Sequence, residues 1–201
     1  MKSLKIKLGS VDGIQADKSM FEQVVKSTKN YNVKIRVDAN GGWNIADAKH
    51  MMQWLADRGV DYVEQPLKEG EEFNLEELYE NRPVPIYLDE TCRFSENISS
   101  FAHCVDGVNM KLMKCGGITE ALKIIKTARK YKLKTMIGCM SESSVSIAAA
   151  AALSGGIDHI DLDSHYNLAP DPSTGAPMVD GVTLPPDIPG HGGELKKEFY
   201  A

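Results

Sequence analysis

Residues 33–66 read VKIRVDANGGWNIADAKHMMQWLADRGVDYVEQP. The apolar positions change from a strand-like run to a helical period and back to a strand-like run, at 33–38, 44–58 and 60–64. Asn44 is suited to cap the start of the helix, and Gly59 is suited to end it. The stretch therefore predicts one β-α-β unit, in which a crossover helix joins two parallel strands.

The alternation of strand and helix continues along the chain, at a spacing of about 25 residues. The strand-like runs fall at 3–7, 33–38, 60–64, 84–89, 107–111, 134–138 and 157–161. Further helices are expected at 118–131 and 143–153. Repeated units of this kind form a TIM-type (β/α) barrel, which usually closes with about eight strands. We therefore expect an α/β fold with an incomplete barrel over residues 1–165, whose first strand lies upstream of residue 1.

The sequence after Asp163 loses the helical period and becomes rich in Pro, Gly and Asp. Its prolines are Pro170, Pro172, Pro177, Pro185, Pro186 and Pro189. Such a composition predicts loops and short hairpins. We expect residues 166–201 to form a loop-rich tail that packs on the barrel or on another domain.

The composition excludes several classes of protein. With 201 residues, 42% hydrophobic and 25% charged, the chain is expected to fold around one core. A net charge of -5 argues against nucleic acid as the main partner. No run approaches the roughly 20 apolar residues of a membrane span. The four cysteines have neither a CxxC pair nor zinc-ligand spacing, and the N-terminus lacks a signal-peptide pattern, so a cytoplasmic protein with reduced thiols is expected.

Three of the predicted strands end in a carboxylate: Asp38, Glu64 and Asp89. In a barrel of parallel strands all carboxyl ends open on the same mouth, so these side chains are expected to meet there. Oxygen ligands of this kind suit Mg²⁺, which keeps further positions for water or substrate. One acidic residue at a strand end could instead cap the next helix. Three in succession favour a metal site.

Lysines are expected at the same mouth. Lys5 and Lys7 are separated by one residue on a strand, so their side chains point to the same face. Near a divalent metal the two lysines would lower each other's pKa, which would let one act as a base. Lys111 ends a later strand, and Lys114 is its rival, which we assign to a loop and a surface pairing.

Asp161 and Asp163 have the same spacing on the last predicted strand. Acidic residues beyond those needed for a metal are suited to bind a cationic group such as an ammonium; the alternative is helix capping with a salt bridge. Gly116 and Gly117 are explained by a tight turn, with a phosphate-binding loop as the alternative.

These motifs together resemble the barrel domain of the enolase superfamily, in the muconate-lactonizing subgroup, and within it the dipeptide epimerases of the L-Ala-D/L-Glu type. The resemblance covers nearly the whole chain. The family motifs fall on Lys5 and Lys7, on Asp38, Glu64 and Asp89, on Lys111, and on Asp161 and Asp163. The context NMKLMKCGG at 109–117 identifies Lys111 rather than Lys114 as the family's catalytic lysine.

The resemblance implies a Mg²⁺-dependent epimerase of dipeptides. One Mg²⁺ would bind Asp38, Glu64 and Asp89. Lys7 and Lys111, on opposite faces of the substrate, would carry out a two-base 1,1-proton transfer at the α-carbon through a metal-stabilised enediolate. Lys5 would lower the pKa of Lys7 and help to hold the substrate carboxylate. Asp161 and Asp163 would bind the α-ammonium of the dipeptide, with L-Ala-L-Glu as the expected substrate.

Other members of the superfamily share the lysine and carboxylate set. Two of them, o-succinylbenzoate synthase and muconate cycloisomerase, are lyase-like alternatives. The third is N-acylamino acid racemase. The Asp161-Leu162-Asp163 element disfavours them, because their substrates lack a free ammonium. Full-length relatives also carry an N-terminal α+β capping domain that sets much of the specificity. This chain is expected to lack it. Three possibilities therefore remain: an upstream segment completes the barrel, the chain forms a homo-oligomer, or the chain is an inactive barrel fragment.

Overall fold

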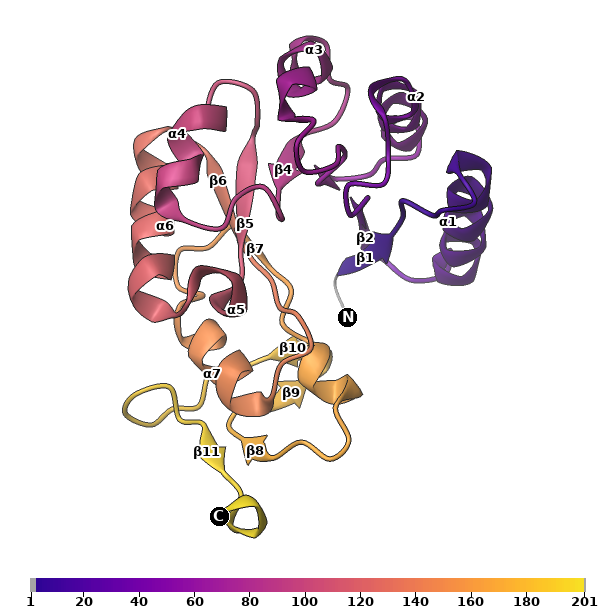
Figure 1. Ribbon diagram of the computed structural model, residues 1–201. Coiled ribbons are helices and arrows are strands. Elements are labelled where there is room, and N and C mark those ends of the chain that lie inside the picture. The colour runs from indigo at the N-terminus through magenta and orange to yellow at the C-terminus, as the bar shows by residue number, and fades with distance from the viewer. Residues whose placement is uncertain (1–2, 201) are drawn as a thin grey trace. The chain divides into compact units, whose positions relative to one another are not determined.

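The computed structural model describes residues 3–200 and contains, within them, one sheet of seven strands (Figure 1). The strands neighbour one another in chain order: β1 (Ser3–Lys7), β2 (Lys34–Asp38), β3 (Val63–Glu64), β4 (Ile86–Leu88), β5 (Gly107–Met110), β6 (Lys134–Ile137) and β7 (His159–Ile160). Strands β1 to β5 pair in parallel, and so do β6 and β7. All seven predicted strands are confirmed, although most are shorter than predicted.

Helices follow the strands along the chain. They are α1 (Ile14–Thr28), α2 (Ile45–Ala56), α3 (Leu75–Glu80), α4 (Ile98–Phe101), α5 (Leu112–Cys115), α6 (Ile118–Lys130) and α7 (Ser144–Ala152). The three helices predicted from periodicity are α2, α6 and α7. The side chain of Asn44 accepts a hydrogen bond from the N–H of Asp47 at 2.9 Å, which confirms the predicted cap of α2. No helix within residues 3–200 has the length and apolar character needed to cross a membrane.

The chain forms two compact units, each with its own interior. The first comprises Met1–Cys92 with Ser100–Val108, and the second comprises Arg93–Ser99 with Asn109–Ala201. In the first unit α1, α2 and α3 lie on one face of β1 to β4 (Figure 1). Fully buried side chains of α2, including Met51 and Leu55, pack there as the periodicity predicts. The division of the chain into 1–165 and 166–201 stays a prediction.

A buried carboxylate in the first unit ties together the loops that follow β1 and β2. Asp17, in the first turn of α1, is fully buried. Its oxygens accept hydrogen bonds from the backbone N–H groups of Gly9 (3.1 Å) and Ser10 (2.9 Å) and from Nε1 of Trp43 (2.9 Å). Because Gly9 and Ser10 follow β1 and Trp43 follows β2, the ends of these two strands are held to the same helix.

Asp17→Asn is expected to lower the free energy of unfolding by about 2 kcal/mol. An amide presents one oxygen in place of two, so at least one of the three N–H donors would face another donor. Urea unfolding measures the change. Asp12→Asn, at an exposed position of the same loop, is the matched control and should leave the midpoint unchanged. Equal midpoints for the two variants would contradict this role of Asp17.

Short strands and loops make up the tail, as predicted. Strand β8 (Ser173–Thr174) pairs with β11 (Glu194–Leu195), and β9 (Met178–Val179) pairs with β10 (Val182–Thr183), both antiparallel. Asp180 and Gly181 have φ values of 52° and 75°, as a two-residue hairpin turn requires. Single 3-10 turns lie at η1 (Glu72–Asn74), η2 (Ser95–Asn97), η3 (Ser164–Asn167) and η4 (Lys197–Phe199).

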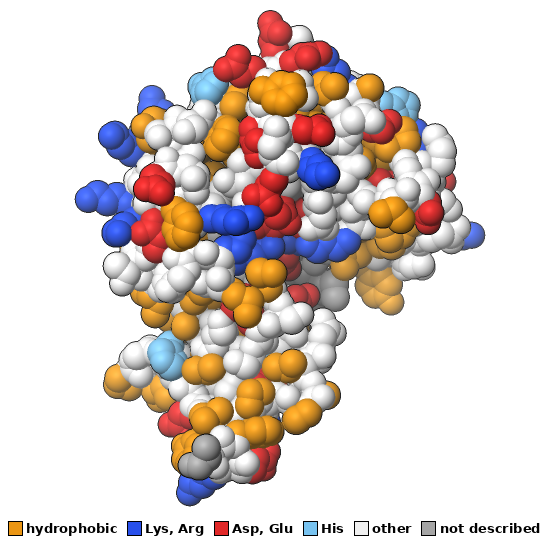
Figure 2. All heavy atoms as spheres, viewed as in Figure 1, with side chains coloured by type: hydrophobic (Ala, Val, Ile, Leu, Met, Phe, Trp, Pro, Cys, Tyr) orange, Lys and Arg blue, Asp and Glu red, His pale blue; other side chains and the backbone are white. Residues whose placement is uncertain are grey.

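Apolar side chains remain exposed on the tail, including Tyr166, Val179 and Leu195. Figure 2 shows many hydrophobic side chains over this part of the second unit. They support the hypothesis that the tail packs on a further part of the protein, which stays a prediction.

Asp171 connects the tail to the start of α7 by hydrogen bonds. Its carboxylate accepts hydrogen bonds from the N–H (3.0 Å) and Oγ (2.6 Å) of Ser144, and from the N–H (2.9 Å) and Oγ (3.0 Å) of Ser173. Burial alone would raise the pKa of Asp171, but these hydrogen bonds outweigh it and lower the pKa below its ordinary value.

The lowered pKa predicts a pH-dependent contribution to stability. Asp171 stabilises the fold fully above the pKa of an unfolded Asp, about 3.9, and this contribution is lost as the pH falls through the lower folded pKa. Thermal unfolding of the chain and of Asp171→Asn should therefore differ most at neutral pH and converge in acid. A difference in melting temperature that stays constant with pH would contradict the prediction.

Candidate active site

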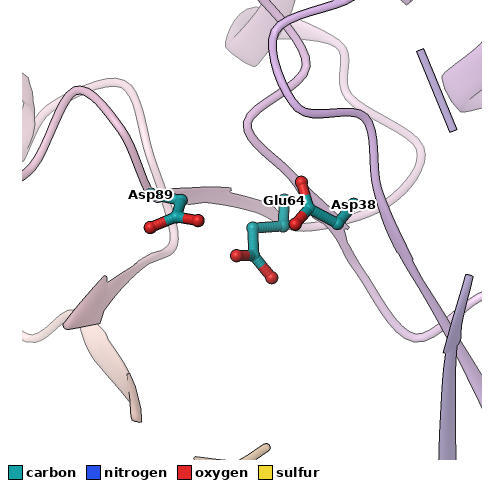
Figure 3. Close-up of side chains that lie close together, drawn as sticks. All are labelled: Asp38, Glu64 and Asp89. Carbon is teal, nitrogen blue, oxygen red and sulfur yellow. The ribbon is translucent and has the colours of Figure 1, made fainter. Parts of the chain in front are cut away.

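Three carboxylates from neighbouring strands of the first unit meet in one cluster (Figure 3). Asp38 is the last residue of β2, Glu64 is the last residue of β3, and Asp89 follows β4 directly. The parallel register sets Asp38 opposite Glu64. Each side chain contributes one oxygen, and these oxygens lie within 4.8 Å of one another. All three residues are fully buried.

Two lysines of β1 contact this carboxylate cluster. Nζ of Lys5 lies 3.1 Å from a carboxylate oxygen of Glu64, and Nζ of Lys7 pairs with Asp38. The Lys5 side chain is 9% exposed, whereas the Lys7 side chain is 55% exposed and can reach a bound molecule. The cluster offers only carboxylate oxygens, which are the ligands that a hard divalent cation such as Mg²⁺ prefers.

The loop after β2 orients one of these carboxylates. Asn40 donates its backbone N–H to Oδ1 of Asp38 at 2.9 Å and its side-chain Nδ2 to Oδ2 at 3.3 Å. Its φ of 46° lies in the left-handed region, which Asn tolerates better than most residues. No motif in the sequence assigned this role to Asn40. Its place two residues after a strand-ending Asp was the available signal.

Lys111 belongs to the second unit and directly follows β5, which ends at Met110. Lys111 is 6% exposed and precedes the short helix α5. Lys114 lies in α5 and not in the predicted loop, and its Nζ donates a hydrogen bond to the backbone carbonyl of Asn109 at 3.1 Å; its surface pairing stays a prediction. Gly116 and Gly117, with φ of 81° and 125°, form the tight turn between α5 and α6.

Asp161 and Asp163 lie just beyond the last strand of the seven-stranded sheet, because β7 ends at Ile160. The expected strand 157–161 extends past β7 by two residues at its start and by one at its end, although the N–H of Asp161 still bonds to the carbonyl of Ile137 at 3.0 Å. Leu162 between them is buried, whereas Asp163 is exposed. Asp163 precedes η3 without a side-chain cap hydrogen bond, so helix capping does not explain it.

Cys139 is adjacent to this acidic pair. Its thiol donates a hydrogen bond to the backbone carbonyl of Asp161 at 3.2 Å. Burial raises the pKa of the Cys139 thiol, with hydrogen bonds from Ser164 acting in the opposite direction. The thiol therefore stays protonated at neutral pH and is unsuited to act as a base.

Residues 1–199 match the family described as Enolase C-terminal domain-like, and the chain belongs to this family. The resemblance drawn from the motifs is thereby confirmed, together with the barrel-type α/β fold. Within this family the chain is similar to dipeptide epimerases.

Among its relatives, a hydrophobic dipeptide epimerase of a Flavobacteria bacterium is 76% identical over 201 residues, covering 100% of this chain and 58% of the relative. A hydrophobic dipeptide epimerase of Roseobacter litoralis is 59% identical over 194 residues, covering 96% of this chain and 56% of the relative. The chain thus spans a little more than half the length of these relatives.

Solved structures of dipeptide epimerases are also similar. That of the Enterococcus faecalis enzyme complexed with Mg and the dipeptide L-Leu-L-Tyr has a TM-score of 0.87 at 34% identity, covering 96% of this chain and 56% of that one. That of the Cytophaga hutchinsonii enzyme complexed with Mg and D-Ala-L-Val has a TM-score of 0.90 at 25% identity, covering 99% and 55%. Both relatives were therefore seen with the metal expected for the carboxylate cluster.

Proposed function

We propose that this chain carries the catalytic barrel residues of a Mg²⁺-dependent epimerase that acts on dipeptides. The observation that carries the proposal is the buried cluster of Asp38, Glu64 and Asp89 with Lys5 and Lys7 in contact with it. Three carboxylate oxygens within 4.8 Å of one another suit one divalent cation. An adjacent lysine that solvent can reach suits a base that exchanges protons with a bound substrate.

The names of the relatives favour a different class of dipeptide substrate from the one that the sequence motifs imply. The relatives at 76% and 59% identity are both named hydrophobic dipeptide epimerases. These names favour dipeptides with apolar side chains over L-Ala-L-Glu, the substrate expected from the resemblance. The free α-ammonium of such a dipeptide would bind Asp161 and Asp163, which form a short acidic element in the second unit.

Asp38, Glu64 and Asp89 would hold the Mg²⁺. When bound, the ion supplies positive charge that stabilises the negative charge developing on the substrate carboxylate as the α-proton leaves. Lys5 would help to orient this carboxylate. Its side chain is only 9% exposed and its ammonium already donates to Glu64, which restricts its position.

The two remaining lysines would transfer protons on opposite faces of the α-carbon. One amine, on Lys7 or Lys111, accepts the α-proton and becomes an ammonium. The other, already an ammonium, donates a proton to the opposite face and becomes an amine. The configuration at the α-carbon is inverted, and exchange with water restores both lysines. The reverse reaction uses the same two groups in exchanged roles.

The test is α-proton exchange in deuterated water, followed by mass spectrometry. A pool of L,L-dipeptides with apolar or acidic side chains is incubated with the chain and Mg²⁺. We expect a gain of one deuteron in the apolar members, which is lost with a chelator. If the chain alone shows no exchange, the part of the Flavobacteria relative that the chain does not match is added as a second chain. No exchange in either mixture would reject the proposed function.

A further inference from the structure

A single glutamine contacts the loops that carry the metal-binding carboxylates. Gln65 directly follows Glu64, is 2% exposed and has a φ of 38°. This left-handed conformation is unfavourable for a residue with a Cβ atom and persists only where the surroundings enforce it. The contacts of Gln65 must therefore hold its backbone in this conformation.

All four hydrogen-bonding positions of the Gln65 carboxamide are used. Oε1 accepts from the backbone N–H groups of Asp89 (2.9 Å) and Thr91 (3.4 Å). Nε2 donates to the carbonyl of Leu67 (2.8 Å) and to Oγ1 of Thr91 (2.9 Å). A flipped amide would aim its NH₂ at two N–H donors, so the surroundings fix the orientation. Oγ1 of Thr91 in turn donates to Glu72 at 3.1 Å.

The backbone of Gln65 extends the same connection to the neighbouring strands. Its N–H donates to the carbonyl of Tyr87 at 2.8 Å, and its carbonyl accepts from the N–H of Gly41, also at 2.8 Å. Gly41 lies in the loop that follows Asp38. Gln65 is thus adjacent to Glu64 in the sequence and hydrogen-bonded to the backbone of Asp89. It is also hydrogen-bonded to the loop that follows Asp38.

We propose that Gln65 is a positioning residue, which holds the Glu64 and Asp89 carboxylates at the separation that Mg²⁺ requires. The inference rests on the proposed metal site. Mg²⁺ demands nearly ideal octahedral geometry at about 2.0–2.1 Å, whereas Ca²⁺ accepts irregular geometry at about 2.3–2.6 Å. A restraint on the carboxylates therefore contributes to selection between the two ions as well as to affinity.

The test compares Mg²⁺ and Ca²⁺ binding by titration calorimetry on the chain and on Gln65→Met. Met has a similar length and no hydrogen-bonding groups that could replace the amide. We expect the Mg²⁺ dissociation constant to rise by about 10- to 100-fold, as for other residues that orient metal ligands. The Ca²⁺ constant should rise by no more than about threefold, because its geometry is less strict. The preference for Mg²⁺ over Ca²⁺ therefore falls.

Met51→Ala is the matched control, because it truncates a fully buried side chain of α2 in the same unit that has no group able to hydrogen-bond to these loops in the way Gln65 does. It should lower stability and leave the ratio of the two constants unchanged. If Gln65→Met does not fold, Thr91→Val removes the hydroxyl that accepts from Nε2, and a smaller shift of the same sign is expected. Thr91→Ser keeps the hydroxyl and should restore the ratio.

Two outcomes overturn the inference, and they can be told apart. If the unaltered chain binds Mg²⁺ but the variants change both constants by the same factor, Gln65 is only structural and the metal site stands. If neither the unaltered chain nor its mixture with the part of the Flavobacteria relative that the chain does not match binds Mg²⁺ in the calorimeter, the proposed function fails, and the role of Gln65 fails with it.

Discussion

Replacing Glu64 by Gln is expected to weaken Mg²⁺ binding by about 100-fold or more, and to remove α-proton exchange with it. Glu64 occupies the middle strand of the three that carry the carboxylate cluster, and it is fully buried. The substitution keeps the shape of the side chain and removes one negative charge. A neutral amide oxygen is a much weaker ligand for Mg²⁺ than a carboxylate in a buried site.

Titration calorimetry measures the loss, and thermal unfolding monitored by circular dichroism verifies that the variant folds. Glu69→Gln makes the same change of charge at an exposed position in the loop that follows β3, and should leave Mg²⁺ binding unchanged. Equal Mg²⁺ affinities for Glu64→Gln and the unaltered chain would show that the carboxylate cluster is not the metal site.

The second large effect is expected from the lysines. Lys7→Ala and Lys111→Ala should each slow epimerisation by at least about 100-fold, the usual scale for a general acid or base. In a two-base reaction each variant keeps one base. Each should therefore still exchange the α-proton of a substrate with one configuration, and lose exchange for the other, in opposite senses for the two variants.

Proton NMR in deuterated water, started from the two epimeric dipeptides in separate tubes, follows this exchange under the conditions in which the unaltered protein is active. Lys114→Ala is the matched control for Lys111, since Lys114 bonds to the backbone carbonyl of Asn109. It should keep both exchanges. If Lys7→Ala and Lys111→Ala lost exchange for the same configuration, the two lysines would not serve as opposed bases.

Local patterns in the sequence predicted the elements whose causes are themselves local. The period of α2, its Asn44 cap and its end near Gly59 depend on residues within one or two turns of helix, and the structure agrees with them. The carboxylates at the ends of β2 and β3 were likewise found, because each is the last residue of an apolar run. Parallel pairing in sequential order then places them side by side.

Contacts between distant residues could not be predicted in this way. Asp17 bonds to Trp43, which is 26 residues away, and Gln65 bonds to Asp89, which is 24 residues away. No periodicity marks such pairs, because each depends on how two loops approach each other in the folded unit. The four-residue helix α5 was also missed, since a single turn carries too few residues to show a helical period.

The environment of Trp43 gives the protein an optical property. The chain has two tryptophans. Trp43 is 2% exposed and bonded to a carboxylate, whereas Trp54 is more accessible and lies 3.6 Å, measured to its ring centroid, from the guanidinium of Arg58. An aqueous quencher will therefore reach the emission of Trp54 before that of Trp43. In a Trp54→Phe background, the remaining fluorescence comes from Trp43 and therefore reports on the surroundings of the hydrogen bond between Trp43 and Asp17.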